Sequence, residues 1–126
     1  MIDTVDFPDI CICVFPFTSG QAAKARPALV LRDLGQDCLV ARITSVSHHG
    51  FLDMAIRDWQ AAGLEKPSTL RLSRLVTVEK TIIRVRIGRL TAEDANRALR
   101  DELAVALACP IAGRQRLPDR ELLAPG

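Results

Sequence analysis

The side chains that could carry acid–base, nucleophilic or metal chemistry are few in this 126-residue chain. Its two histidines, His48 and His49, are adjacent in a polar segment. A histidine titrates near neutral pH, so either could act as a general acid or base or bind a phosphate. Two of the four cysteines, Cys11 and Cys13, stand two apart in an extended apolar run and share one face of a strand. We interpret them as small core residues.

Neither a metal ion nor another cofactor is expected. A metal site would need further soft ligands near the first two cysteines, and the histidine pair lies far along the chain from them. An aliphatic-rich chain can build a core without disulfides, and the cytosol keeps thiols reduced. We therefore predict free thiols and no metal.

Basic residues gather in one stretch, although the formal net charge is only +2. Between Lys66 and Leu90, seven basic residues stand against Glu79 alone, an excess of six positive charges. Such an excess could attract phosphate groups. The alternative is a solvated strand face balanced by the acidic helix that follows, and charge alone does not decide between them.

Alternating and continuous apolar segments predict several short strands. The predicted strands cover residues 9–17, 27–33, 38–45, 52–59, 69–72 and 82–90. A tight turn over residues 34–37 should join the second and third strands into a hairpin. In the last strand the alternation places Arg84 and Arg86 on the face opposite the apolar residues Ile83, Val85 and Ile87.

A single helix should follow, beginning at Thr91, with Asp94 where a capping box usually carries Glu or Gln. Its apolar stripe is formed by Ala95, Leu99, Leu103 and Leu107. Pro110 ends the helix, and residues 110–126 are predicted to be an extended or mobile tail. Residues 1–109 are thus expected to form one domain, a small, mainly antiparallel β-barrel covered by a helix.

Five motifs occur in a characteristic order. They are DICICVFPFTSG from Asp9, KARPALVL (24–31), ARITS (41–45), DWQAAGLEKPSTLRL (58–72) and RIGRLTAED (86–94). In this order they resemble the MazF/PemK-like toxins of type II toxin–antitoxin systems, from about Asp9 to Leu107. The resemblance implies an SH3-like barrel of the CcdB/PemK kind, a homodimer, metal-independent cleavage of single-stranded RNA, and neutralisation by a cognate antitoxin in the active groove.

The resemblance also implies roles for particular residues. Arg26, in the Arg-Pro dipeptide, and Thr44, in the Ile-Thr-Ser motif, fall on the catalytic pair of the family. Residues 18–25 correspond to its gating loop, where Gln21-Ala22-Ala23 departs from the usual glycine, serine and lysine. The candidate substrate-binding residues are Thr18, Ser19, Lys24, Ser45, His48, Arg84 and Arg86.

The chemistry suits these groups because RNA carries its own nucleophile, the 2′-hydroxyl. Negative charge gathers on the non-bridging oxygens during attack on phosphorus, and a forked guanidinium such as that of Arg26 can donate two hydrogen bonds to them. The same group could donate a proton to the leaving 5′-oxygen. Thr44 offers a hydroxyl that is a weak base, so we expect it to orient the reacting groups.

Plainer interpretations exist for each of these residues. An arginine before a strand proline is usually a solvated strand end, and a Thr-Ser pair usually caps one; the motif order is what favours Arg26 and Thr44. Trp59 could stack on a base, but it follows an alternating strand and is more typical of core packing.

No apolar run approaches the roughly 20 residues of a membrane-spanning helix, and the acidic N-terminus has no export signal. We expect a soluble, cytoplasmic protein. Two other functions stay open: a binding module of the same fold that does not cleave, and a superfamily toxin that acts on a protein, as CcdB-like relatives act on gyrase.

Overall fold

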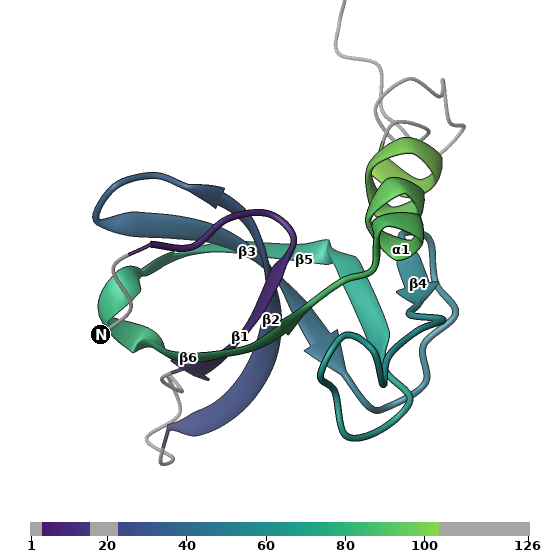
Figure 1. Cartoon of the computed structure of the whole chain (residues 1–126), viewed down its shortest axis with the longest axis horizontal. Helices are drawn as coiled ribbons and strands as arrows, with labels where there is room; N and C mark the ends of the chain where they lie inside the picture. The colour runs from purple at the N-terminus through teal and green to yellow at the C-terminus, as the bar shows by residue number, and fades with distance from the viewer. Residues whose placement is uncertain (1–3, 16–22, 104–126) are drawn as a thin grey trace, which may run out of the picture.

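The computed structural model describes residues 4–15 and 23–103 (Figure 1). The elements in chain order are β1 (Asp9–Phe15), β2 (Lys24–Asp33), β3 (Asp37–Thr44), β4 (Asp53–Ala55), β5 (Thr69–Glu79), η1 (Lys80–Ile82), β6 (Ile83–Arg89), α1 (Ala92–Asn96) and η2 (Arg97–Leu103). The element η1 is a 3₁₀ turn, and η2 is a π-helical continuation of α1. No described helix is long and apolar enough to cross a membrane.

The strands form one antiparallel sheet in the order β4-β5-β3-β2-β1-β6. Figure 1 shows this sheet curling on itself, with α1 beside β4. The predicted mainly β fold with a C-terminal helix is confirmed. The barrel differs from the prediction in one respect, because within the described residues β4 and β6 are unpaired edges and the sheet does not close. The turn η1 joins β5 to β6, but the two strands do not form a hairpin, because β6 pairs with β1 at the opposite edge of the sheet.

Two apolar clusters pack on the curled sheet. Ile10 of β1 belongs to the first cluster, with Leu29 and Ile43, whereas Cys11 and Cys13 belong to the second. The core positions predicted for these cysteines are confirmed, and the three described cysteines are buried and free. Burial raises the pKa of the Cys13 thiol to about 12, so this group is a protonated, unreactive apolar side chain at neutral pH.

The predicted hairpin of the second and third strands is confirmed by the antiparallel pairing of β2 with β3. Two other strand predictions were wrong in extent. The strand β4 ends at Ala55 instead of residue 59, because the backbone amides that follow bind a distant carboxylate, as described below. The strand β5 runs on to Glu79, far beyond residue 72, because β3 pairs with it as far as Asp37.

The predicted two-sided alternation of the last strand also fails. Val85 of β6 is 49% exposed, although it was expected on the apolar face with Ile83. The cause is the register with β1, which shifts twice and leaves Arg84 and Ile87 without partners in the ladder. Each such bulge reverses the side-chain alternation beyond it.

The helix α1 begins after Thr91 as predicted, and the Thr91 hydroxyl accepts a hydrogen bond from the Asp94 amide at 3.3 Å. The predicted stripe was wrong at Leu99, which is 44% exposed, while Ala98 is fully buried. The buried face is centred on Asp94 and Ala98, and Leu99 falls at its margin. The predictions for the side chains of Leu103 and Leu107, for Pro110 and for the tail 110–126 lie outside the described residues.

The β4–β5 loop (residues 56–68) contacts β6 backbone to backbone at two glycines. A Cβ atom at Gly88 would collide with the carbonyl oxygen of Ala62, and one at Gly63 with that of Ile87. Gly63 also has a φ of 93°, which disfavours other residues. The loop is therefore held at a fixed place beside β6.

We predict that Gly88→Ala lowers the free energy of unfolding by about 3 kcal/mol, because a backbone carbonyl cannot move aside as a flexible side chain can. Denaturant unfolding followed by circular dichroism measures this change. The matched control is Gly35→Ala in the β2–β3 turn, where φ is 99° but the space around the new Cβ is open; there we expect a loss of about 1 kcal/mol from backbone strain alone. Equal losses in the two variants would contradict the close loop contact.

Candidate functional site

The two residues predicted to be catalytic lie together at one end of the sheet. The register pairs Ala28 of β2 with Arg42 of β3. Arg26 precedes Ala28 by two residues and Thr44 follows Arg42 by two, so alternation directs both side chains to the same face. Arg26, Ile43 and Thr44 line both of two adjoining hollows, and they therefore form the boundary between them.

The larger hollow has a volume of about 530 Å³ and a mixed character. Its walls come from the start of β2, the end of β3 and the β4–β5 loop, with one residue each from β1 and β6. Apolar side chains such as Ile12, Pro27 and Leu64 face it together with Ser45 and Lys66. Its size falls in the range of pockets that hold small organic ligands, so it suits a base and its ribose.

The smaller hollow, of about 240 Å³, is strongly cationic. Its lining residues are Arg26, Arg42, Ile43, Thr44, His48, Arg71 and Arg74. Four guanidinium groups thus surround it, and no carboxylate is among the residues that line it. Such a surface favours an anion.

The Thr44 hydroxyl has a backbone hydrogen-bond partner. Its oxygen accepts a hydrogen bond from the Val46 amide at 3.1 Å, which leaves the hydroxyl proton to be donated. Arg26 is exposed, and within the described part of the chain no ion pair joins it to a carboxylate. The two groups can therefore donate hydrogen bonds to one negatively charged oxygen-rich ligand.

The other predicted site residues differ in how close they lie to the two hollows. Ser45 lines the larger hollow and His48 the smaller one. Lys24 begins β2 but lines neither hollow. Thr18 and Ser19 lie outside the described residues. His49 is exposed and approaches the Ser47 hydroxyl at 3.5 Å.

Arg84 and Arg86 are not brought to either hollow. Arg86 forms a 3.0 Å ion pair with Asp9 and donates to the Thr4 carbonyl at 2.8 Å. Arg84 is exposed on β6, where the bulges spread the basic residues over several directions. The stretch of excess positive charge is therefore not one surface, and contact of Arg84 and Arg86 with a phosphate stays a prediction.

Three arginines of the smaller hollow were not among the predicted site residues, although Arg71 and Arg74 belong to the basic stretch between Lys66 and Leu90. Arg42 lies two residues before Thr44, so strand alternation alone could have placed both on one face. Arg71 and Arg74 are three apart, a spacing that puts side chains on opposite faces of a regular strand. Nothing in the local pattern of the sequence indicates that they converge.

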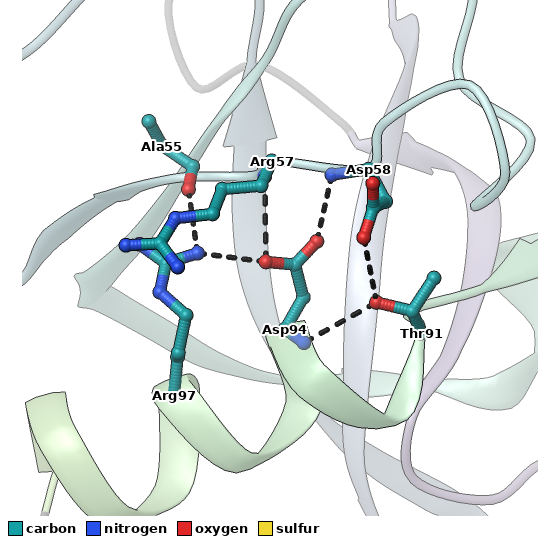
Figure 2. A network of polar contacts seen from close by, with 6 residues as sticks. All are labelled: Ala55, Arg57, Asp58, Thr91, Asp94 and Arg97. Carbon is teal, nitrogen blue, oxygen red and sulfur yellow. Dashed lines mark hydrogen bonds and ion pairs between the residues drawn. The ribbon is translucent and has the colours of Figure 1, made fainter.

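A buried carboxylate holds the β4–β5 loop against the helix (Figure 2). Asp94 of α1 is fully buried and accepts hydrogen bonds from the amides of Arg57 and Asp58 at 3.3 and 2.9 Å. Arg97 donates to the same carboxylate at 2.7 Å and to the Ala55 carbonyl at 3.1 Å. The end of β4 and the first residues of the loop are thereby tied to the helix.

This network positions one wall of the larger hollow. From Asp58 the loop continues through internal hydrogen bonds, Ala62 amide to Asp58 carbonyl and Leu64 amide to Trp59 carbonyl, both 3.0 Å. Trp59 packs against the first apolar cluster, which confirms its predicted packing role. The loop then presents residues 63–66 and Ser68 to the larger hollow. In the described residues, no group of three His, Cys, Asp or Glu side chains could hold a metal ion.

Comparison with known proteins gives one family. Residues 7–111 match the model of the PemK-like, MazF-like toxins of type II toxin–antitoxin systems. A comparison with curated protein sequences finds no significant match.

Several solved structures share the fold. One is an endoribonuclease in complex with its cognate antitoxin from a mycobacterial species, with a TM-score of 0.65 and 17% identity over 82% of this chain and 95% of that one. Another endoribonuclease from a mycobacterial species has a TM-score of 0.62 and 17% identity, over 82% and 91% of the two chains. The Mycobacterium tuberculosis toxin MazF-mt6 has a TM-score of 0.60 and 22% identity, over 77% and 95%.

We predict that Asp94→Asn destabilises the fold by about 3 kcal/mol, as expected when one partner of a buried ion pair is removed. All three groups around the carboxylate are donors, so the amide nitrogen of an asparagine would have to face one of them. Denaturant unfolding at neutral pH measures the loss. The control is Glu93→Gln, at an exposed position of the same helical turn, for which we expect about 0.5 kcal/mol or less. Equal effects in the two variants would contradict the role assigned to the network.

Proposed function

Because the chain belongs to the PemK-like, MazF-like toxin family of type II toxin–antitoxin systems, we propose that it is an endoribonuclease that cleaves single-stranded RNA without a metal ion. The observation that carries this proposal is the position of Arg26 and Thr44 on the boundary between an apolar-walled hollow and a cationic one. A nucleoside in the larger hollow and the scissile phosphate at the boundary would meet both side chains. The similar mycobacterial structures, described as endoribonucleases, support this reading.

In the proposed reaction the ribose 2′-hydroxyl attacks the adjacent phosphorus. A new bond from the 2′-oxygen to phosphorus forms while the bond to the 5′-oxygen of the next nucleotide breaks. The 2′-hydroxyl loses a proton and the 5′-oxygen gains one, so the step consumes no water. The products are a 2′,3′-cyclic phosphate and a 5′-hydroxyl.

Arg26 acts through electrostatics in this reaction. Its guanidinium is always charged, and its fork can donate two hydrogen bonds to the non-bridging oxygens as negative charge develops on them. A group already in place gives more stabilisation than water, which must reorient during the reaction. The exposure of Arg26 and the absence of a carboxylate partner in the described residues leave both arms of the fork available.

Thr44 acts as an orienting donor. The Val46 amide occupies part of its oxygen's acceptor capacity, which disfavours a role in removing the 2′-hydroxyl proton. The remaining hydroxyl proton can be donated to a phosphate oxygen, and Ser45 extends the polar edge into the larger hollow. The pair thus fixes the phosphate between strands β2 and β3.

A cognate antitoxin and a second copy of the chain are the proposed protein partners. One of the similar structures is a complex with a cognate antitoxin, and an acidic antitoxin segment would be attracted to the guanidinium groups around the smaller hollow. The Val46 to Phe51 segment next to the hollows exposes two large apolar side chains, Val46 and Phe51. Such side chains suit an interface, and a dimer would deepen the open groove that one copy presents to RNA.

We predict that the purified protein cleaves unstructured RNA in the presence of EDTA and leaves 2′,3′-cyclic phosphate and 5′-hydroxyl ends. Arg26→Ala should lower the rate by about 10²-fold or more, because one preorganised donor to the developing charge is lost. Arg26→Lys should restore little, since lysine lacks the fork. Thr44→Val should also lose most of the rate. Gel analysis of end-labelled RNA and mass spectrometry of the products measure these effects.

The controls for cleavage are Arg32→Gln, at the far end of β2, and His49→Ala, since neither residue lines a hollow. A larger loss for His48→Ala than for Arg26→Ala would indicate a histidine mechanism instead. Products with 3′-hydroxyl and 5′-phosphate ends, or inhibition by chelators, would indicate metal-activated water. RNA binding without cleavage would favour a binding module, and the absence of both would favour a protein target.

We also predict a homodimer in solution at micromolar concentration. Light scattering coupled to gel filtration should give a mass close to twice 13.8 kDa. A monomer mass that does not change with concentration would exclude a groove built from two copies. This result would leave the chemistry assigned to Arg26 and Thr44 untouched.

A further inference from the structure

Cleavage at the boundary does not account for the cationic lining of the smaller hollow. With about 240 Å³ it is less than half the size of the larger hollow, and four of its seven lining residues are arginines. We propose that it is a second phosphate subsite, which binds the RNA phosphate next to the scissile one. This inference rests on the proposed function, and it names Arg42, Arg71 and Arg74 as substrate-positioning residues.

The subsite is created by an irregularity in β5. Opposite Ala41 and Arg42 of β3, the partner jumps from Leu75 to Arg71, so three residues of β5 have no partner in the ladder. This bulge lets Arg71 and Arg74, which would face opposite sides in a regular strand, line one hollow. Bulges characteristically re-aim side chains in this way beside functional sites.

Arg71 is held in position before any ligand binds. Its Nε donates to Asp53 at 3.0 Å, and Asp53 in turn accepts from the Gly50 amide at 2.8 Å. The hydrogen bond from Arg71 lowers the pKa of the Asp53 carboxyl, so the pair stays charged at neutral pH. Because the contact uses Nε, the two terminal amino groups of the guanidinium remain to form a fork around a phosphate.

The Arg42 guanidinium contacts an aromatic ring. Its guanidinium carbon lies 4.9 Å from the centroid of the Phe15 ring, which is a cation–π contact. Arg42 and Arg71 are also direct partners across β3 and β5. Two rigidly placed guanidinium groups thus flank the hollow.

Arg74 supplies the remaining charge. It is exposed, and no carboxylate in the described residues forms an ion pair with it. Guanidinium groups clustered around one hollow repel one another, and a bound phosphate would replace that repulsion with attraction. The larger hollow, with its apolar walls and Glu65, lacks this character. The charge distribution therefore favours a phosphate in the smaller hollow and a nucleoside in the larger one.

The first experiment measures binding, so that it does not depend on cleavage. A fluorescent 12-nucleotide RNA of mixed sequence, fully 2′-O-methylated and hence uncleavable, is titrated at several salt concentrations. Arg74→Gln should weaken binding roughly tenfold at low salt and reduce the slope of log K against log salt by about 0.7, the value for one lost phosphate contact on a single strand. Arg42→Gln provides a second variant with the same expected direction. Arg32→Gln, exposed on β2 but lining neither hollow, should leave the slope unchanged.

The second experiment identifies the phosphate. In an RNA whose cleavage position has been mapped, the phosphate on the 5′ or the 3′ side of the cleaved linkage is replaced by an uncharged methylphosphonate. One of these replacements should slow cleavage by the unmodified protein by about tenfold, and Arg74→Gln should be almost insensitive to it. If the methylphosphonate slows cleavage by Arg74→Gln as much as it slows cleavage by the unmodified protein, the two changes act independently and the proposal is overturned.

The outcomes separate this proposal from the proposed function. A reduced salt slope in these arginine variants without any cleavage by the unmodified protein would support phosphate binding in the smaller hollow, but it would refute the endoribonuclease and with it a place next to a scissile phosphate. If the unmodified protein cleaves RNA but Arg74→Gln and Arg42→Gln both leave the slope of log K against log salt unchanged, the subsite alone is refuted. If these variants bind RNA normally but lose affinity for a hexaglutamate peptide, the smaller hollow binds acidic protein segments and the subsite proposal is wrong.

Discussion

The antiparallel register between β2 and β3 is the constraint on which both the core and the site depend. Pairing of Ala28 with Arg42 places Leu29 in one apolar cluster and Val30 in the other, and it brings Arg26 beside the end of β3. A slip of one residue would exchange the two faces of a strand. It would expose apolar side chains and separate Arg26 from Thr44. The free energy of core burial thus holds the proposed catalytic pair in register.

Irregular places in the other strands shape the surroundings of this pair. The bulge in β5 directs Arg71 and Arg74 into one hollow, whereas the bulges in β6 lead Arg86 away toward Asp9. Only part of the basic stretch between Lys66 and Leu90 therefore contributes to the cationic surface. The cationic surface is made by three strands that each contribute one or two arginines to the same end of the sheet.

The wall of the larger hollow depends on contacts of two kinds. Asp94 is buried, and its charge is tolerated because two backbone amides and Arg97 satisfy it. Gly63 and Gly88 allow the backbones of the β4–β5 loop and β6 to touch. The loop is thus rigidly connected to the helix on one side and to the sheet on the other. A loop fixed in this manner can present a preformed surface to a ligand without an entropic cost of ordering.

Local sequence patterns were enough to predict the mainly β fold, the β2–β3 hairpin, the buried cysteines and the start of the helix at Thr91, because each depends on residues close together in the chain. The order of its motifs indicated Arg26 and Thr44. Contacts between distant parts of the chain make Arg42, Arg71 and Arg74 converge and keep Arg86 apart from them. Such contacts also let Asp94 bind amides 36 and 37 residues away instead of completing a capping box. Strand alternation describes a regular ladder. A bulge or a buried carboxylate changes the direction of a side chain through pairing with distant strands, which a local pattern does not contain.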